Sequence, residues 1–278
     1  MVDLSRKYSW NGNEALINAA HMVNELHGVN DLQVENWLDY DEVDLLTKIS
    51  KPHKETLLHD YISFITFTMY EYTLDKHFPM AVINPLVELM NIYDVDYSYL
   101  GEAPFIGLDD EDLHLYGYDQ NLVEKFAHKI FKLYGEKLEP TMVSDIFTVL
   151  FANKQFLYEF NKQLQEVVEV LKLKDHPDYL KKDGVFKRCK YLPKWLQKGV
   201  FMRDKGRCQI CGTDLTKVLH LDNQENYDHI IPLESGGTND PTNFQLTCEH
   251  CNKSKGDRST MYHSLGARFW ENENLFPK

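Results

Sequence analysis

The sequence lacks long apolar runs, because no stretch reaches the roughly 18 consecutive apolar residues that a membrane-spanning helix needs. Its first residues, Met1 to Lys7, also lack the apolar segment of a signal peptide. We therefore expect a cytoplasmic protein without a membrane partner. Residues 1–180 contain no glycine-rich phosphate loop, no internal repeat and no acid/base pair, so the sequence does not say what this part does.

Cysteine is also scarce, with five in 278 residues. Four of them form two Cys-x-x-Cys pairs, Cys208 with Cys211 and Cys248 with Cys251. In a reducing compartment this spacing favours zinc over disulfides. Four thiolates close the coordination shell of Zn²⁺, so the predicted zinc site is structural and does not activate water. Cys189 is left over and is expected to be a free thiol.

Positive charge is scarce overall but concentrated in one segment. The net charge is -13. Residues 1–180 carry 14 Lys and Arg against 31 Asp and Glu, whereas residues 181–207 hold ten basic residues and two acidic ones. Proteins that contact phosphate keep their positive charge local. The strip therefore predicts a nucleic-acid-binding segment, with Arg203, Lys205 and Arg207 as candidate contacts just before the first cysteine pair.

Apolar periodicity predicts an N-terminal all-α domain over 1–180 and a smaller second domain over 181–278. The composition, 43% hydrophobic and 13% aromatic, is rich enough for real cores. Residues 94–119 are expected to form a loop, whose acidic run is either solvated or a docking surface or phosphate mimic. The expected helices span 13–27, 41–49, 52–77, 80–92, 121–134, 140–152, 153–174, 194–204 and 261–275, with a linker at 176–184.

An Asp-His pair lies between the two cysteine pairs, in the segment Tyr227 to Pro232. The pattern around it predicts a strand, a loop at Gly236-Gly237, a second strand at 244–247 and a short helix after Cys248. A further strand is expected at 218–221, where His220 is either an ordinary strand residue or an additional ligand. This order would bring Asp228, His229 and Asn252 together.

These pieces resemble the HNH endonucleases, whose fold is a ββα-metal finger. The resemblance covers about residues 192–256. The matching pieces are Arg203-Asp204, Asp228-His229-Ile230-Ile231-Pro232, Gly236-Gly237, Asn243-Phe244-Gln245-Leu246, Cys251-Asn252 and Lys255-Gly256. The third letter of the family name stands for a site residue that is often histidine, and here that residue is Asn252.

The resemblance implies a role for each of these residues. His229 would be the base that deprotonates water, and Asp228 and Asn252 would offer hard oxygen ligands to Mg²⁺ or Mn²⁺. Asn243 would hold the loop and orient the histidine. Lys255 is the expected phosphate contact on the helix.

The resulting hypothesis is a metal-dependent DNA endonuclease with low sequence specificity of its own. The acidic helical domain would then recruit, sense or regulate through a protein partner, as in nuclease effectors of antiphage defence. The alternatives are a non-catalytic zinc module that binds nucleic acid or protein, and an enzyme that cuts RNA. The oligomeric state stays open.

Overall fold

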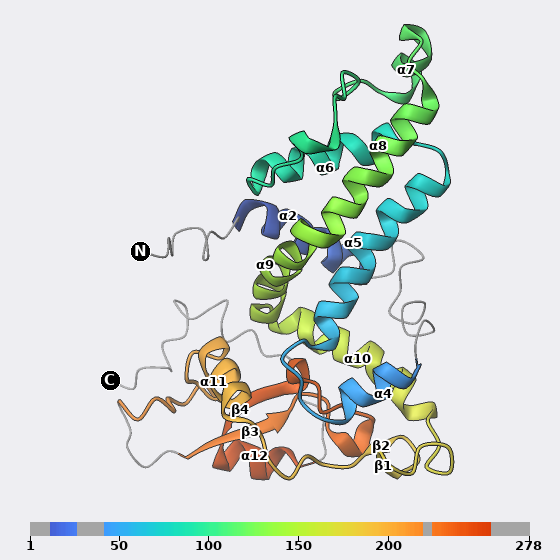
Figure 1. The fold of residues 1–278 in the computed structure, drawn as a ribbon. Coiled ribbons are helices and arrows are strands. Elements are labelled where there is room, and N and C mark those ends of the chain that lie inside the picture. Colours follow the sequence, from blue (N-terminus) through green and yellow to red (C-terminus); the bar gives the residue numbers. More distant parts are fainter. Residues whose placement is uncertain (1–11, 27–41, 219–223, 257–278) are drawn as a thin grey trace. The chain divides into compact units, whose positions relative to one another are not determined.

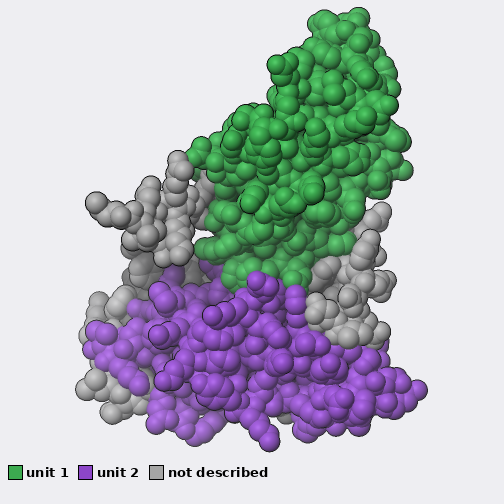
Figure 2. Space-filling model, in the orientation of Figure 1, with its two compact units in different colours: residues 1–22, 59–149 green, residues 23–58, 150–278 purple. Residues whose placement is uncertain are grey.

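The computed structural model describes residues 12–26, 42–218 and 224–256. The chain forms two compact units, coloured in Figure 2. Unit 1 comprises 1–22 and 59–149, and unit 2 comprises 23–58 and 150–278. The predicted domain boundary at residue 180 lies inside unit 2, and the assignment of functions to two domains stays a prediction. His220 and the predicted helix at 261–275 lie outside the described residues.

Unit 1 is built from helices, as the apolar periodicity predicts (Figure 1). Helices α6 and α8 each bury a row of apolar side chains, and they pack on each other. In the described ranges no helix is long and apolar enough to cross a membrane. The elements are α2 (Gly12–Leu26), α5 (Leu57–Asp75), α6 (Met80–Ile92), η1 (Ser98–Leu100), α7 (Asp110–Tyr116), α8 (Gln120–Leu133), the π-helical turn η2 (Tyr134–Leu138) and α9 (Glu139–Ala152).

The acidic run at 109–112 begins helix α7, where the sequence predicts only a loop. The Asp109 side chain accepts a hydrogen bond of 2.7 Å from the Asp112 amide, which is an N-cap. Acidic side chains in a first turn are also favoured by the helix dipole. Gly117 ends the helix in a left-handed conformation with φ 70°. Helix capping therefore accounts for these acidic residues locally.

Unit 2 contains the predicted strand–loop–strand–helix order. Strands β3 (Glu225–His229) and β4 (Phe244–Cys248) pair antiparallel, and helix α12 (Glu249–Lys255) packs on both. The fold class is thus mainly α with a small ββα module, as predicted. The predicted linker at 176–184 instead includes part of a hairpin of β1 (Leu180–Lys182) and β2 (Val185–Phe186). The other elements are α4 (Glu42–Ser50), α10 (Lys154–Val170), α11 (Lys194–Arg203), η3 (Leu233–Ser235) and η4 (Pro241–Asn243).

The core of the ββα module lies between α11, β4 and the cysteine pairs. It is small, and three of the four paired cysteines lie within it. Its buried members are Leu196, Val200, Cys208, Leu215, Phe244, Leu246, Cys248 and Cys251.

Candidate active site and zinc site

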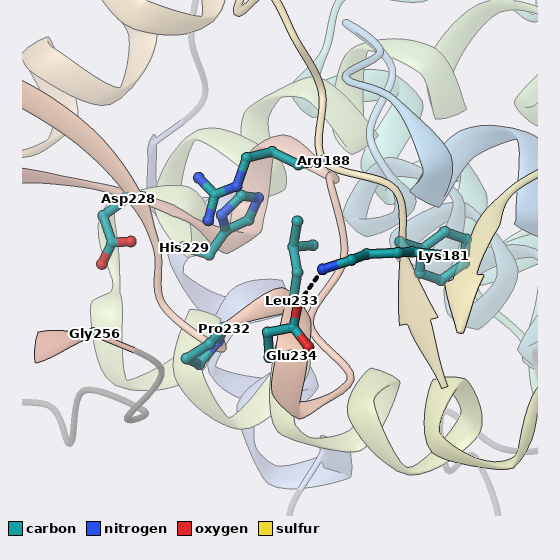
Figure 3. Close-up of a pocket in the computed structure, with 9 residues that line it drawn as sticks. Lys181, Arg188, Asp228, His229, Pro232, Leu233, Glu234 and Gly256 are labelled. Carbon is teal, nitrogen blue, oxygen red and sulfur yellow. Dashed lines mark hydrogen bonds and ion pairs between the residues drawn. The ribbon is translucent and has the colours of Figure 1, made fainter. Parts of the chain in front are cut away.

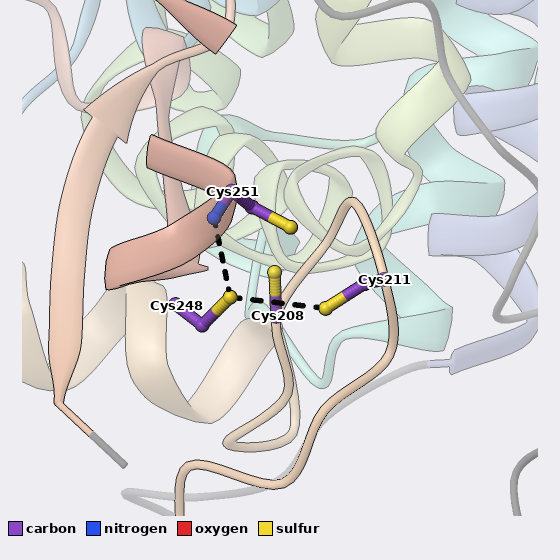
Figure 4. A group of neighbouring side chains, drawn as sticks. All are labelled: Cys208, Cys211, Cys248 and Cys251. Atoms are coloured by element: carbon purple, nitrogen blue, oxygen red, sulfur yellow. Dashed lines mark hydrogen bonds between the residues drawn. The ribbon is translucent and has the colours of Figure 1, made fainter. Parts of the chain in front are cut away.

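The four paired cysteines converge at one point (Figure 4). All four Sγ atoms lie within 4.8 Å of one another, and those of Cys211 and Cys248 are 3.8 Å apart. Tetrahedral zinc with Zn–S bonds of about 2.3 Å needs sulfur–sulfur separations of roughly 3.8 Å. The cluster therefore fits a structural zinc site, as the spacing predicts.

The chemistry of the thiols also calls for a cation at this point. Burial raises the pKa of Cys208, and burial likewise raises the pKa of Cys251. Such groups stay protonated unless a positive charge stabilises their thiolates. At Cys211, burial opposes the shift, but hydrogen bonds from Thr213 lower the thiol pKa to about 7. A Zn²⁺ ion would supply the charge that the buried thiolates need.

Strand β3 ends with Asp228 and His229. Asp228 lies opposite Gln245 and His229 lies opposite Phe244 in the register with β4. Successive side chains of a strand point to opposite faces, so Asp228 and His229 leave the hairpin on different sides. Both residues nevertheless line one pocket.

The imidazole of His229 is buried, with 3% of the residue exposed. Its Nε2 lies 3.3 Å from the Asn239 Oδ1, and its Nδ1 has no hydrogen-bond partner in the part of the chain that is described. Burial, together with the positive charges of Arg188 and Lys255, lowers the pKa of His229 to about 3, although the Asn239 contact acts in the opposite direction. The ring is therefore neutral near pH 7, with a lone pair on one of its two nitrogens.

The loop before β4 is polar and yet fully enclosed. Asn239, Asp240 and Asn243 are each 0–1% exposed. Asn243 Oδ1 accepts from the Ile231 amide at 2.8 Å, and its Nδ2 donates to the Ile231 and Thr238 carbonyls, both at 2.9 Å. Asn243 thus bridges the two ends of the loop, whereas its predicted role in orienting His229 stays a prediction. The side chain that touches His229 is Asn239, whose importance the sequence does not reveal.

Two segments distant in sequence cover this loop. The Asn239 amide donates to the Ile49 carbonyl at 2.9 Å, at the end of α4. The Leu57 amide donates to Asp240 Oδ2 at 2.9 Å. On α10, the Asn161 Nδ2 lies 3.2 Å from the Thr242 hydroxyl. Residues 42–58 and α10 are therefore structural parts of the site.

Lys255 reaches Asp228 from helix α12. Its Nζ donates to Asp228 Oδ2 at 2.5 Å and also to the His229 carbonyl, and the residue is only 6% exposed. The sequence suggests a phosphate contact at Lys255. In the structure its ammonium instead neutralises the carboxylate predicted to bind a metal ion. Asn252 lies one turn earlier on α12 and is half-buried.

The predicted nucleic-acid contacts divide into buried and exposed residues. The Arg203 side chain is 2% exposed, donates to Asp204 at 2.8 Å and lies over the Phe151 ring, so it serves the core rather than a surface. Arg207 is half-buried beside the first cysteine pair and is 3.5 Å from the Gly212 carbonyl. Of the four predicted contacts, Lys205 alone is exposed.

A surface pocket leads to His229 (Figure 3). Its lining includes Asp228 and His229 together with Lys181, Arg188 and Glu234. Glu234 pairs with Lys181 at 2.9 Å, whereas Arg188 is exposed and has no ion pair within the described ranges. Sequence analysis counts Arg188 in the basic strip but does not single it out, because only the fold brings it beside the histidine.

Comparison with known proteins identifies the module. Residues 208–258 match the family model described as HNH endonuclease. This segment contains both cysteine pairs, the β3–β4 hairpin and α12, so the resemblance found in the sequence is confirmed over the C-terminal module. No curated protein and no solved structure matches the chain. At the level of the family, the module is of the nuclease type.

Proposed function

We propose that the protein is a metal-dependent endonuclease that hydrolyses phosphodiester bonds of DNA. The observation that carries the proposal is a buried imidazole, His229, whose Nδ1 has no hydrogen-bond partner among the described residues and which lines one pocket together with the Asp228 carboxylate. A structural zinc module has no need of either group there. The match to the HNH endonuclease family supports the same reading.

In the proposed reaction, water attacks the scissile phosphorus and the bond from phosphorus to the 3′ oxygen breaks. His229 Nδ1 takes the proton of the attacking water, and the leaving 3′ oxygen gains a proton from solvent. Asp228 and Asn252 would hold Mg²⁺ or Mn²⁺. When bound, such an ion stabilises negative charge on the pentavalent phosphate and on the leaving oxygen. Lys255 would have to yield Asp228 to the ion.

The unpaired Arg188 supports a phosphate substrate at this pocket. A guanidinium can bind phosphate oxygens through two parallel hydrogen bonds. The exposed Lys205 and the pocket's Lys181 add positive charge to a unit whose charge is otherwise mixed. Contacts of this kind read the backbone and not the bases, which fits an enzyme with low sequence preference.

We further propose that unit 1 binds a protein partner that selects the target or restrains the nuclease, as in an antiphage defence effector. Its acidic composition makes it a poor candidate for reading DNA. Pull-down with the protein as bait, against a protein lacking 59–149, would test this. If both baits recover the same proteins, unit 1 is not what binds the partner.

The activity is tested by plasmid nicking with Mg²⁺, Mn²⁺ or EDTA, comparing the wild type with His229→Ala. We expect nicking by the wild type with a divalent ion and a loss of at least about 100-fold in the variant, in the range of general-base catalysis. If the wild type and His229→Ala nick the plasmid equally with every ion, the catalytic assignment is wrong and the alternative of a non-catalytic zinc module is favoured. Faster cutting of single-stranded RNA than of duplex DNA would make RNA the substrate.

A further inference from the structure

We propose that Asn239 is a positioning residue that fixes the His229 imidazole as the tautomer with hydrogen on Nε2. This inference rests on the proposed role of His229 as the base. It assigns the orientation of the ring to a residue that sequence analysis leaves as an ordinary loop position. It also makes α4, nearly 200 residues earlier in the chain, part of the machinery that holds the base.

The orientation of the Asn239 amide is determined by two carbonyl groups. Its Nδ2 donates to the Ser50 carbonyl at 2.9 Å and to the Lys187 carbonyl at 2.9 Å. A flipped amide would place its oxygen against both carbonyl oxygens, inside a site where Asn239 is 0% exposed. Such buried unpaired acceptors cost about 1–3 kcal/mol each. The flipped state is therefore strongly disfavoured.

The remaining amide atom, Oδ1, faces His229 Nε2 at 3.3 Å. An amide oxygen accepts hydrogen bonds and cannot donate them. The contact therefore favours a hydrogen on Nε2, and in a neutral ring Nδ1 is then the atom with a free lone pair. Nδ1 is also the ring atom with no partner among the described residues. The one amide thus selects which nitrogen can accept a proton.

The backbone of Asn239 fixes the amide from a second direction. The backbone N–H of Asn239 donates to the Ile49 carbonyl at 2.9 Å. The next carbonyl along the chain, that of Ser50, accepts from the Asn239 side chain. Ile49 and Ser50 are the last residues of α4. Because helix ends leave their last carbonyls free, α4 presents two acceptors to the same residue. Asn239 is held at three points, which leaves its oxygen little freedom.

The direct test is a long-range ¹H–¹⁵N NMR spectrum of the His229 ring in the zinc-loaded, full-length protein, with no divalent ion added at the active site. We expect the pattern of a neutral ring protonated at Nε2. A wild-type ring protonated at Nδ1 would overturn the proposal whatever the variants do. The spectrum needs no catalysis, so it is independent of whether the protein cuts DNA.

Two variants separate orientation of the ring from support of the loop. Asn239→Leu removes the acceptor, and we expect a mixture of tautomers. Asn239→Asp keeps an oxygen facing Nε2 but turns its second oxygen toward the Ser50 and Lys187 carbonyls. We expect a lower melting temperature, with the Nε2–H form retained in the folded protein. The matched control is Asn161→Leu, because Asn161 is also a buried amide that supports the same loop but does not touch His229.

The expected result is that Asn161→Leu lowers the melting temperature without altering the tautomer. If Asn239→Leu retained a pure Nε2–H ring, the amide would not be what fixes it. If plasmid nicking is observed, Asn239→Leu should lower kcat at least tenfold with little change in KM. A change confined to KM, equal in the two Leu variants, would indicate a structural role only. If neither Leu variant folds, the proposal is tested by the wild-type spectrum and by the tautomer found in Asn239→Asp.

Discussion

The pair formed by Lys255 and Asp228 shows how one side chain can occupy the position of a cofactor. The ammonium is bound to the carboxylate and to the His229 carbonyl in a nearly closed environment. Any divalent ion that binds Asp228 must therefore displace or share this contact. The ammonium of a lysine is positively charged, as a metal ion is. It carries one charge instead of two, however, and it has no open coordination shell to bind a phosphate oxygen or water.

At this scale we predict that Lys255→Met destabilises the protein and that Mg²⁺ or Mn²⁺ restores part of the loss. Removing one partner of a buried ion pair costs about 3–5 kcal/mol, since the remaining charge is uncompensated. A divalent ion would compensate the Asp228 carboxylate instead. The measurement is chemical denaturation in EDTA and in millimolar metal.

The control for that prediction is Lys253→Met on the same helix. Lys253 is exposed and pairs with Glu249 four residues earlier, so its loss should change stability by less than about 0.5 kcal/mol. Equal effects of the two substitutions would show that the buried pair adds nothing. A Lys255→Met protein that gains no stability from either ion would argue against Asp228 as a ligand.

At the scale of the element, the loop between β3 and β4 is shaped by a close backbone approach at Gly237. A Cβ atom at that position would lie 2.0 Å from the Ile231 carbonyl oxygen. No real contact of this kind is so short, so the backbone itself would have to move. The same turn carries the chain from His229 to Asn239, so its shape also sets the distance between those two residues.

We predict that Gly237→Ala lowers the free energy of unfolding by at least about 2 kcal/mol, as overpacking does. The matched control is Gly199→Ala in α11, where a Cβ would meet nothing within 4 Å. That change should stabilise the helix by up to about 1 kcal/mol. Urea denaturation of both variants gives the comparison. A neutral Gly237→Ala would mean that the turn tolerates a rearranged backbone.

The elements could largely be predicted from the sequence, because periodicity, caps and breakers are local. The expected helix at 80–92 is α6, and the one at 194–204 differs from α11 by one residue. The α7 helix was missed because its acidic cap resembles a solvated run. The β1–β2 hairpin was missed because its strands are only two or three residues long, too short to show alternation.

The candidate site could be predicted only where residues are close in sequence or share a known ligand spacing. The cysteine pairs and the Asp228-His229 dipeptide meet this condition. Tertiary structure brings Asn239 and Arg188 beside the histidine and the Ser50 carbonyl beside Asn239, and no local pattern encodes those contacts. For the same reason Arg203 was expected on the surface, although its guanidinium is a core group.

At the scale of the whole molecule, unit 2, which holds the candidate site, is discontinuous in sequence. We predict that a fragment of residues 150–278 alone leaves the loop at 238–243 unprotected, and that adding a synthetic peptide of residues 42–58 restores it. The peptide supplies the carbonyls that bind Asn239 and the amide that binds Asp240. Amide exchange of the zinc-loaded fragment measures the effect.

A peptide with the same composition in scrambled order is the control for that experiment, and it should leave exchange unchanged. Equal protection of the loop in the fragment with and without the native peptide would show that residues 42–58 cover the site without supporting it.

This discontinuity has a consequence for the order of events at the ribosome. Residues 59–149 leave the exit tunnel before the strands and cysteines of the ββα module, so unit 1 can fold while the module is still being translated. The segment at 42–58 must wait for partners made about 180 residues later. His229 can therefore be oriented only after the loop at 238–243 has been made, so a chain that stops before this loop would lack the proposed base in its oriented form.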